Sequence, residues 1–146
     1  MAIGTLMPRR FIDTNVLLRH ITDDNPVQSP LAAEVLDQIA DGQIEGILSI
    51  TVIFETVFTL QGLYKFEREM IAPAIRVIVG APGLHLIDAS EELVSRTLDL
   101  YTSIRKLSFA DCYHAVLSQS FCNGEIYTFD KEFDRIPELT RLEPGE

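Results

Sequence analysis

Short apolar runs that alternate with longer segments of helical periodicity constrain the fold of this 146-residue chain most strongly. The strand-like runs lie at the start of Arg10–Leu18 and at Ile47–Ile50, Leu84–Ile87 and Ile126–Phe129, with a short edge strand expected at Arg141–Leu142. Because short loops join these runs to the helical segments, the order indicates an α/β fold. We expect one domain with a mainly parallel central sheet of four to five strands, flanked by helices.

The helical segments are marked by apolar spacing and by residues that start or stop a helix. Apolar residues at helical spacing across 31–40 stop at Gly42, and another helix is expected from about Thr51. The remaining helices are expected at Arg68–Val79, from Ser90 onward, and from Ser108 to about Phe121.

Size and composition favour a single globular domain. Hydrophobic residues make up 47% of the chain and charged residues 23%, and no run reaches the ~18–20 apolar residues of a membrane span. The N-terminal residues lack the apolar region of a signal peptide, and Cys112 and Cys122 do not form a metal-ligand pattern. We therefore expect a cytoplasmic protein in which both cysteines are reduced core residues.

The segment that begins at Met7, MPRRFIDTNVLL, enters the first strand at once and reads as a complete start. We expect residues 1–6 to be an N-terminal extension and residues 7–146 to form the domain. Firm packing of the first six residues into the core would contradict this division.

Three acids stand alone in apolar surroundings, and a fourth follows an apolar run. They are Asp13 in FIDTNVLL, Glu55 in ITVIFETVFTL, Asp111 in LSFADCYHAVL and Asp130 after EIYTF. A carboxylate in a buried segment is costly unless a cation or a hydrogen-bond donor compensates it. Because ligands of parallel sheets bind at the carboxyl ends of the strands, we expect the four acids to converge there. A divalent metal with oxygen ligands is the simplest shared compensator.

A group of carboxylates of this kind suits hydrolysis of a phosphodiester bond. The reaction needs an activated water and stabilisation of negative charge, and two metals about 3.5–4 Å apart supply both. One Mg²⁺ with retained waters is the weaker version of this arrangement. No nucleophilic serine or cysteine motif, Gly-rich phosphate loop or zinc spacing in the sequence competes with it.

The net charge of −10, from 22 acidic and 12 basic residues, argues against a nucleic-acid substrate. Nucleic-acid binders are usually basic, because neutralisation of phosphates drives their affinity. A bound divalent metal would make the local electrostatic potential positive at the acids, which partly removes the repulsion of a nucleic acid. The acidity of the chain also favours a basic protein partner. Five basic residues flank the first and last acids as candidate phosphate contacts: Arg9, Arg10, Arg19, Lys131 and Arg135.

Four motifs in order resemble the PIN domain: FIDTNVLL, a glutamate in an apolar helix, LSFADCYHA and IYTFDKEFDRI. More closely, they resemble the VapC-type ribonuclease toxins of bacterial toxin–antitoxin pairs. The resemblance runs from Arg10 to Leu142. It implies a metal-dependent ribonuclease that uses Mg²⁺, with Mn²⁺ as a substitute.

The resemblance assigns Asp13, Glu55, Asp111 and Asp130 to the acidic quartet that binds the metal and carries catalysis in the family. Asp134 stands where many members have a further, less regular acid, and is a fifth candidate ligand. Three polar residues are expected to brace the site or to orient a water or an aspartate: Asn15, Ser108 and Thr128.

The resemblance also implies partners. The substrate would be RNA, the partner an antitoxin protein with a basic segment, and the chain would form a homodimer around Phe54–Leu63 and the following helix. Two alternatives remain: a housekeeping RNA-processing PIN nuclease, and a non-catalytic binding module with a degenerate site. The second would be expected to have lost an acid, and none of the four is missing.

Each acid also has an ordinary structural explanation. Asp13 suits an Asx-turn, Glu55 the exposed face of an amphipathic helix, and Asp111 the N-terminus of a helix. Asp130 suits a turn, and Asp134 suits a local salt bridge.

Overall fold

The structure is a computed structural model that describes residues 7–145. The chain divides after Ala89 into two compact units, and each is described by itself. The expected extension at residues 1–6 lies outside the described residues. No helix within 7–145 has the length and apolar character that a membrane span requires.

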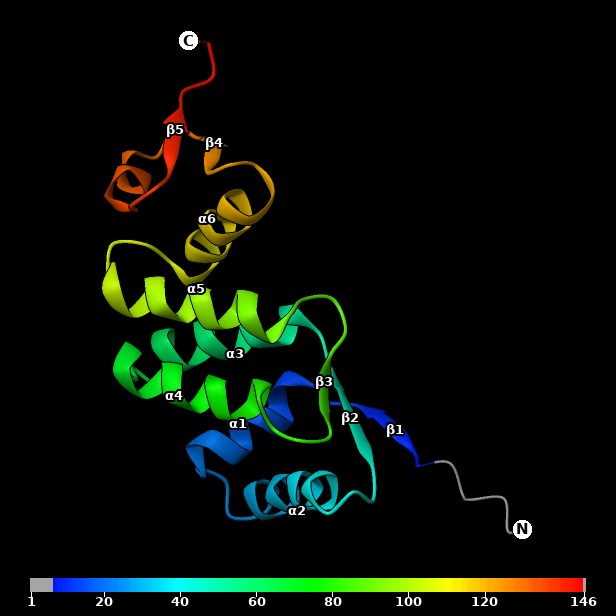
Figure 1. Ribbon diagram of the computed structural model, residues 1–146. Helices are drawn as coiled ribbons and strands as arrows, with labels where there is room; N and C mark the ends of the chain where they lie inside the picture. The colour runs from blue at the N-terminus through cyan, green and yellow to red at the C-terminus, as the bar shows by residue number, and fades with distance from the viewer. Residues whose placement is uncertain (1–6, 146) are drawn as a thin grey trace, which may run out of the picture. The chain divides into compact units, whose positions relative to one another are not determined.

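The first unit is built on a three-stranded parallel sheet with the order β1-β2-β3 (Figure 1). The strands are β1 (Arg9–Phe11), β2 (Glu45–Leu48) and β3 (Leu84–Leu86). Gly46 of β2 pairs with Leu84 of β3, and a Cβ atom at Gly46 would lie 2.5 Å from Leu84 Cδ2 and 2.8 Å from Ile39 Cδ1. The absence of a side chain at Gly46 therefore allows Ile39 to approach the sheet closely.

Four helices complete the first unit. They are α1 (Thr14–Thr22), α2 (Gln28–Ala40), α3 (Ile50–Gly62) and α4 (Arg68–Val79). Helix α1 packs against both α2 and α3, and α3 packs against α4. The fully buried aliphatic residues of these helices form the core of the unit: Leu17, Ile53, Leu60, Ile71 and Ile75. This packing places the start of α1 beside α3.

The start of α3 is tied to the segment that follows β3. Asp88 Oδ1 accepts a hydrogen bond from the Ile50 backbone N–H (2.7 Å), and its Oδ2 accepts one from the Ser49 hydroxyl (2.7 Å). The Ile50 N–H, followed by the Ser49 hydroxyl, lowers the pKa of Asp88 below its ordinary value of 3.8. Asp88 thus caps the helix that carries Glu55, although it comes from a distant part of the sequence.

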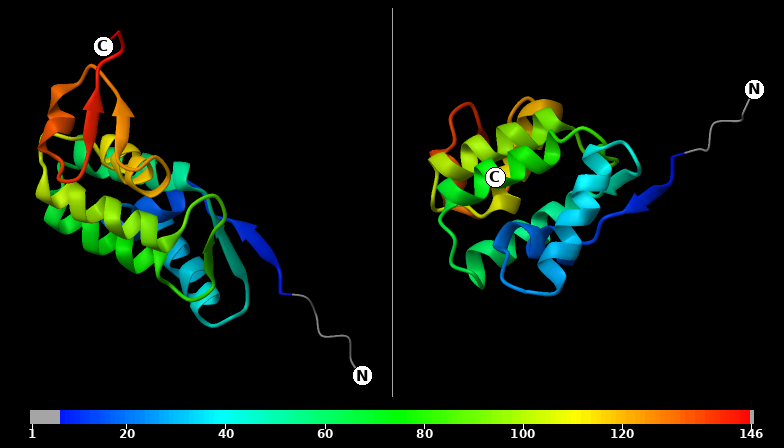
Figure 2. Two further views of the ribbon diagram at one scale, coloured as in Figure 1. Left: turned by 45° about the horizontal axis from the view of Figure 1, so that its top comes forward. Right: turned by 90° about the horizontal axis from the view of Figure 1, so that it is seen from below.

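The second unit contains two helices, a short 3₁₀ helix and a two-stranded parallel sheet. The elements are α5 (Glu91–Ser103), α6 (Phe109–Phe121), β4 (Glu125–Tyr127), η1 (Lys131–Arg135) and β5 (Thr140–Leu142). Helices α5 and α6 pack together, and the rings of Tyr101 and Phe109 meet edge to face at 5.6 Å. Strands β4 and β5 run side by side in the same direction (Figure 2).

The α/β fold predicted from the sequence is confirmed, including the helix starts at Ser90 and Ser108. Each of these serines accepts a hydrogen bond from a backbone N–H three residues later, at 3.1 Å. The predicted size of the sheet is wrong, because the described strands form one sheet of three strands and one of two. Strands of three or four residues offer few ladder hydrogen bonds, so apolar runs in the sequence do not determine which strands pair.

The cysteine prediction is correct in part. Both cysteines are free, and Cys112 lies in the core as expected. Cys122 is exposed, because it follows the last residue of α6 at the helix C-cap and not on its buried face.

Replacement of Asp88 by alanine should lower the free energy of unfolding at neutral pH by about 1 kcal/mol, as for loss of a helix N-cap. Because folding lowers the pKa of Asp88, its stabilisation is present above the unfolded-state pKa of about 3.8 and is lost as the pH falls through the folded-state value. Urea unfolding of wild type and Asp88→Ala at pH 7 and pH 3 tests this. Equal stability of the two proteins at pH 7 would show that the cap is not formed.

Candidate active site

Asp13 lies where the chain leaves the sheet and enters α1. The preceding Ile12 is buried, and its N–H donates to Ile47 O at 2.9 Å, which continues the pairing of β1 with β2. Asp13 is the N-cap of α1, and its Oδ1 accepts a hydrogen bond from the Thr14 N–H at 2.8 Å. Its carboxylate is therefore at the carboxyl end of β1 and at the positive end of a helix dipole.

Glu55 reaches the same place from α3. Its Oε2 accepts a hydrogen bond from the Thr14 hydroxyl at 2.9 Å. Thr14 is only 7% exposed, so its position is set by the packing of α1. A single buried threonine thus holds two carboxylates, Asp13 through its backbone N–H and Glu55 through its hydroxyl.

The two carboxylates open into a pocket of about 390 Å³ between α1 and α3, which we call the acid pocket. Asn15 lines it beside the two acids, so this predicted bracing residue does lie at the site. The end of α3 and the residues after it also line the pocket, through Thr59, Leu63 and Tyr64. The pocket lies entirely within the first unit.

Arg19 also lines the acid pocket, and a hydrogen-bond network holds it there. Asp24 accepts from the Tyr64 hydroxyl (2.8 Å), the Thr22 hydroxyl (2.8 Å) and Arg19 Nη1 (3.1 Å). These donors, the Tyr64 hydroxyl first, lower the pKa of Asp24 below 3.8. Asp24 stays ionised at neutral pH and fixes the guanidinium at the edge of the pocket.

In the second unit, Asp111 is the third residue of α6 and is half-buried. Its backbone N–H donates to the Ser108 hydroxyl at 3.1 Å. Ser108 was expected to orient a water or an aspartate. Its hydroxyl accepts from the main chain of Asp111 and so fixes the start of the helix that carries the acid, and the expected role of Ser108 toward a water or an aspartate stays a prediction.

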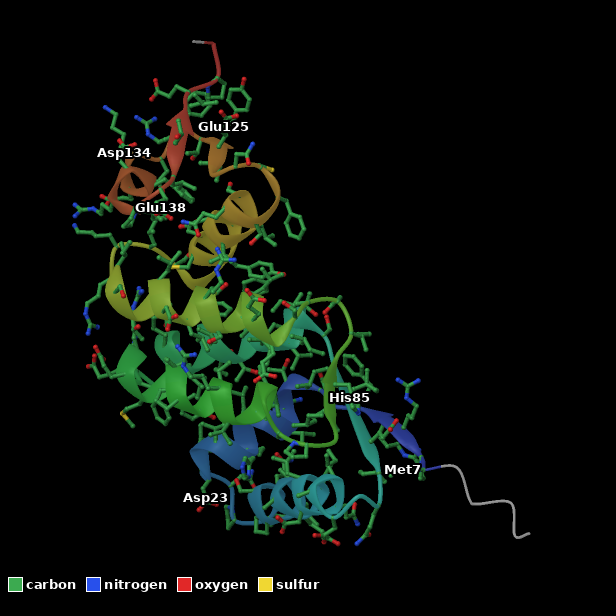
Figure 3. The ribbon with its side chains drawn as sticks, viewed as in Figure 1. Met7, Asp23, His85, Glu125, Asp134 and Glu138 are labelled. Atoms are coloured by element: carbon green, nitrogen blue, oxygen red, sulfur yellow. The ribbon has the colours of Figure 1, made fainter. Side chains whose placement is uncertain are left out.

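Asp130 and Asp134 lie at the two ends of a short turn. Asp130 is the N-cap of η1: its Oδ1 accepts from the Glu132 N–H at 2.9 Å, and its own N–H donates to the Thr128 hydroxyl at 3.0 Å. Asp134 lies on η1 beside β5 (Figure 3), where its Oδ1 accepts from Arg141 Nε at 3.0 Å. This bond, followed by the one that Arg141 donates to Glu143, raises the pKa of Arg141. Asp134 therefore acts as an ion-pair partner, in line with its ordinary structural explanation.

The expected burial of the acids is wrong for three of the four. Asp13, Glu55 and Asp130 are exposed, and only Asp111 is half-buried. For Glu55 the reason is helical periodicity, which places it on an exposed stripe of α3 with Thr51 and Phe58. A helix of mainly apolar composition can thus still have an exposed stripe that carries an acid.

Residues 10–139 match the PIN domain family. The chain belongs to the PIN domain family. PIN domains are generally metal-dependent nucleases. None of the curated proteins compared with the chain matches it significantly.

The donor groups at the acid pocket suit a divalent metal. Asp13 and Glu55 present carboxylate oxygens to one pocket, together with the amide of Asn15, and Mg²⁺ prefers oxygen donors of this kind. Across residues 7–145, no three His, Cys, Asp or Glu side chains are grouped as metal ligands. The donor chemistry fits, and convergence of all four acids stays a prediction.

Thr14 and the network around Arg19 were not predicted from the sequence as parts of the PIN site. Thr14 follows Asp13 directly, but its bond to Glu55 joins residues 41 positions apart, which no local pattern reveals. Tyr64 and Asp24 are likewise 40 positions apart. Arg19 was expected only as one of several phosphate contacts.

Replacement of Thr14 by valine should weaken Mn²⁺ binding about tenfold, because loss of a hydrogen bond that orients a ligand typically costs 10–100-fold in metal affinity. Valine keeps the shape of the side chain and leaves the backbone bond to Asp13. Thr14→Ser is the matched control, since it retains the hydroxyl. Calorimetric titration with Mn²⁺ measures the effect, and one dissociation constant shared by all three proteins would contradict it.

Proposed function

We propose that this PIN domain is a Mg²⁺-dependent ribonuclease, with Mn²⁺ able to substitute, and that it is the toxin of a toxin–antitoxin pair. The observation that carries the nuclease proposal is the pair of carboxylates held by Thr14 at one pocket. Surface carboxylates repel one another, so holding two of them together favours a site that binds a cation.

We propose Asp13, Glu55, Asp111 and Asp130 as the residues that hold the metal and carry catalysis. When bound, a divalent metal supplies an activated water and neutralises charge on the phosphate. The resemblance of the four motifs to the PIN quartet supports the assignment of all four acids. The hydrogen bonds within the first unit support Asp13 and Glu55, and the caps of α6 and η1 hold Asp111 and Asp130 at helix N-termini.

The net charge of −10 would repel RNA phosphates, so a basic residue is needed near the acid pocket to contact them. Arg9 pairs with Glu45 at 3.3 Å, Arg135 pairs with Glu132, and Arg19 pairs with Asp24 at 3.1 Å, so the position of each residue, and not its freedom from an acid, distinguishes them. Arg19 is the basic residue that lines the acid pocket. We therefore propose that Arg19 contacts the phosphate backbone, and that single-stranded loops, more than overall charge, determine which RNA binds.

The toxin role is proposed from the acidic surface as well as from the motif resemblance. A basic segment of an antitoxin would find charge-assisted partners in Asp13 and Glu55, and its binding there would exclude a metal. A housekeeping RNA-processing nuclease is the alternative, and it would need no such inhibitor.

A homodimer is proposed on the exposed apolar side chains of α3 and α4. Phe58 is 80% exposed and Leu63 is 74% exposed, although large apolar side chains usually avoid water. Met70 and Val77 are exposed one heptad apart on α4, which packs beside α3. These four side chains lie where the expected dimer surface was placed.

Purified wild type should cleave a pool of structured RNAs with Mg²⁺ or Mn²⁺ and lose this activity in EDTA. Asp13→Asn and Asp111→Asn should lower the rate at least about 10²-fold, because each removes a negatively charged ligand. Electrophoresis of labelled RNA measures cleavage.

Asp37→Asn, on the exposed surface of α2, is the matched control and should cleave as wild type does. Equal activity of all variants would reveal a contaminating nuclease. A wild type that neither cleaves nor binds a metal would refute the catalytic proposal.

The wild type should have a solution mass near twice its chain mass of 16.4 kDa, and Phe58→Glu should be monomeric because the charge cannot be buried in an apolar interface. Light scattering during gel filtration across micromolar concentrations measures this. Phe121→Glu replaces an equally exposed phenylalanine on α6 and should remain dimeric. A monomeric wild type would refute the dimer.

A further inference from the structure

A second pocket lies on the other side of α1 from the acid pocket. Its volume is about 430 Å³, and we call it the α1–α2 pocket. It is lined by Asn15, Val16 and Arg19 from α1 and by Gln28, Leu31 and Val35 from α2. It too lies entirely within the first unit.

The two pockets share Asn15 and Arg19. These residues are four positions apart on α1, so their side chains follow one another along a single ridge of the helix. The ridge has the acid pocket on one side and the α1–α2 pocket on the other. A chain molecule that crosses this ridge would occupy both pockets at once.

Arg19 is held in place on the ridge by three partners. Its Nε donates to Gln28 Oε1 at 2.8 Å, and its Nη1 donates to Asp24 Oδ1 at 3.1 Å and to the Tyr64 hydroxyl at 3.4 Å. Among the residues that the structure describes, Nη2 of Arg19 and the side-chain amide of Asn15 have no hydrogen-bond partner. The ridge therefore presents an ordered cation and an amide with donors to spare.

The α1–α2 pocket also has an apolar lining. Val16 of α1 and Leu31 and Val35 of α2 supply it, and Leu31 is 57% exposed. Unstacked RNA bases are recognised by stacking on aromatic side chains or guanidinium planes together with hydrogen bonds at their edges, and a base taken out of a stack also packs against apolar side chains. An aliphatic lining beside an amide and a guanidinium therefore offers packing for a base face, and hydrogen bonds for its edge and its phosphate.

We infer that the α1–α2 pocket holds one base of single-stranded RNA, from a nucleotide next to the phosphodiester that is cleaved at the acid pocket. Arg19 is a positioning residue: it contacts the phosphate that joins this nucleotide to its neighbour at the acid pocket. The inference rests on the proposed ribonuclease function. The volume of about 430 Å³ lies within the range of about 300–1,000 Å³ that is typical of small-ligand sites.

Binding is tested first without any cleavage. Each of the four ribonucleoside 5′-monophosphates is titrated in EDTA into ¹⁵N-labelled protein. Saturable shifts of the Asn15 and Gln28 side-chain amides and of Arg19 Nε–H are expected with at least one of them. No saturable shift at these three groups with any nucleotide would overturn the inference, whether or not the protein cleaves RNA.

The second test uses Leu31→Glu, which places a negative charge at the pocket on an exposed position of a helix that tolerates glutamate. For an oligoribonucleotide that wild type cleaves, KM should rise about tenfold, the scale of one lost base contact, while kcat stays within about twofold. Replacing one nucleotide of the substrate by an abasic ribose should raise KM for wild type and remove the difference between wild type and variant.

Val27→Glu is the matched control, because it adds the same charge at the start of the same helix but outside the pocket lining. Equal KM values for the two variants would show only long-range repulsion and would overturn the inference. A wild type that cleaves no RNA would refute the proposed ribonuclease, and the nucleotide titration would still decide the pocket. Displacement of a bound nucleotide by a basic peptide without any effect of Leu31→Glu would assign the pocket to a protein partner instead.

Discussion

Two hydrogen bonds from Thr14 determine the geometry of the acid pocket, and one of them joins the start of α1 to α3. The Thr14 N–H orients Asp13, and its hydroxyl orients Glu55. Thr14 can hold both carboxylates because it is buried as the first residue of α1, whereas Asp13 and Glu55 are exposed. The rigid part of the site thus lies beneath its charged groups, and Asp88 stabilises it further by capping α3.

An acidic PIN domain must bring a polyanion to a cluster of carboxylates. The structure offers an ordered cation for this at the ridge of α1, where Asp24 and Tyr64 hold Arg19. Asp24, which orders Arg19, is itself an acid beside the pocket and offsets the charge of the guanidinium. Arg19 therefore contributes oriented hydrogen-bond donors more than net positive charge. Recognition would then depend on the shape and bases of the RNA, which is consistent with a base pocket beside the acid pocket.

The order of strands and helices was predictable, because apolar runs, serine caps and glycine stops are local features of the sequence. The pairing of strands was not, since it depends on contacts such as the one between Gly46 and Leu84. The exposure of Glu55 was not predictable either. Its apolar neighbours in the sequence indicated burial, but the orientation of α3 places its side chain on the exposed face of the helix. Asp13 and Glu55 stand out in the sequence by their isolation, and the structure brings both to one pocket, whereas the bond from Thr14 spans 41 residues and was not predictable.

The most direct test of the proposed metal site is the position of a metal in a crystal grown with Mn²⁺, found from its anomalous scattering. A Mn²⁺ is expected within coordination distance of the Asp13 and Glu55 carboxylates, with Asp111 and Asp130 at the same site. A metal bound only at other acids, or none at a saturating concentration of Mn²⁺, would contradict it.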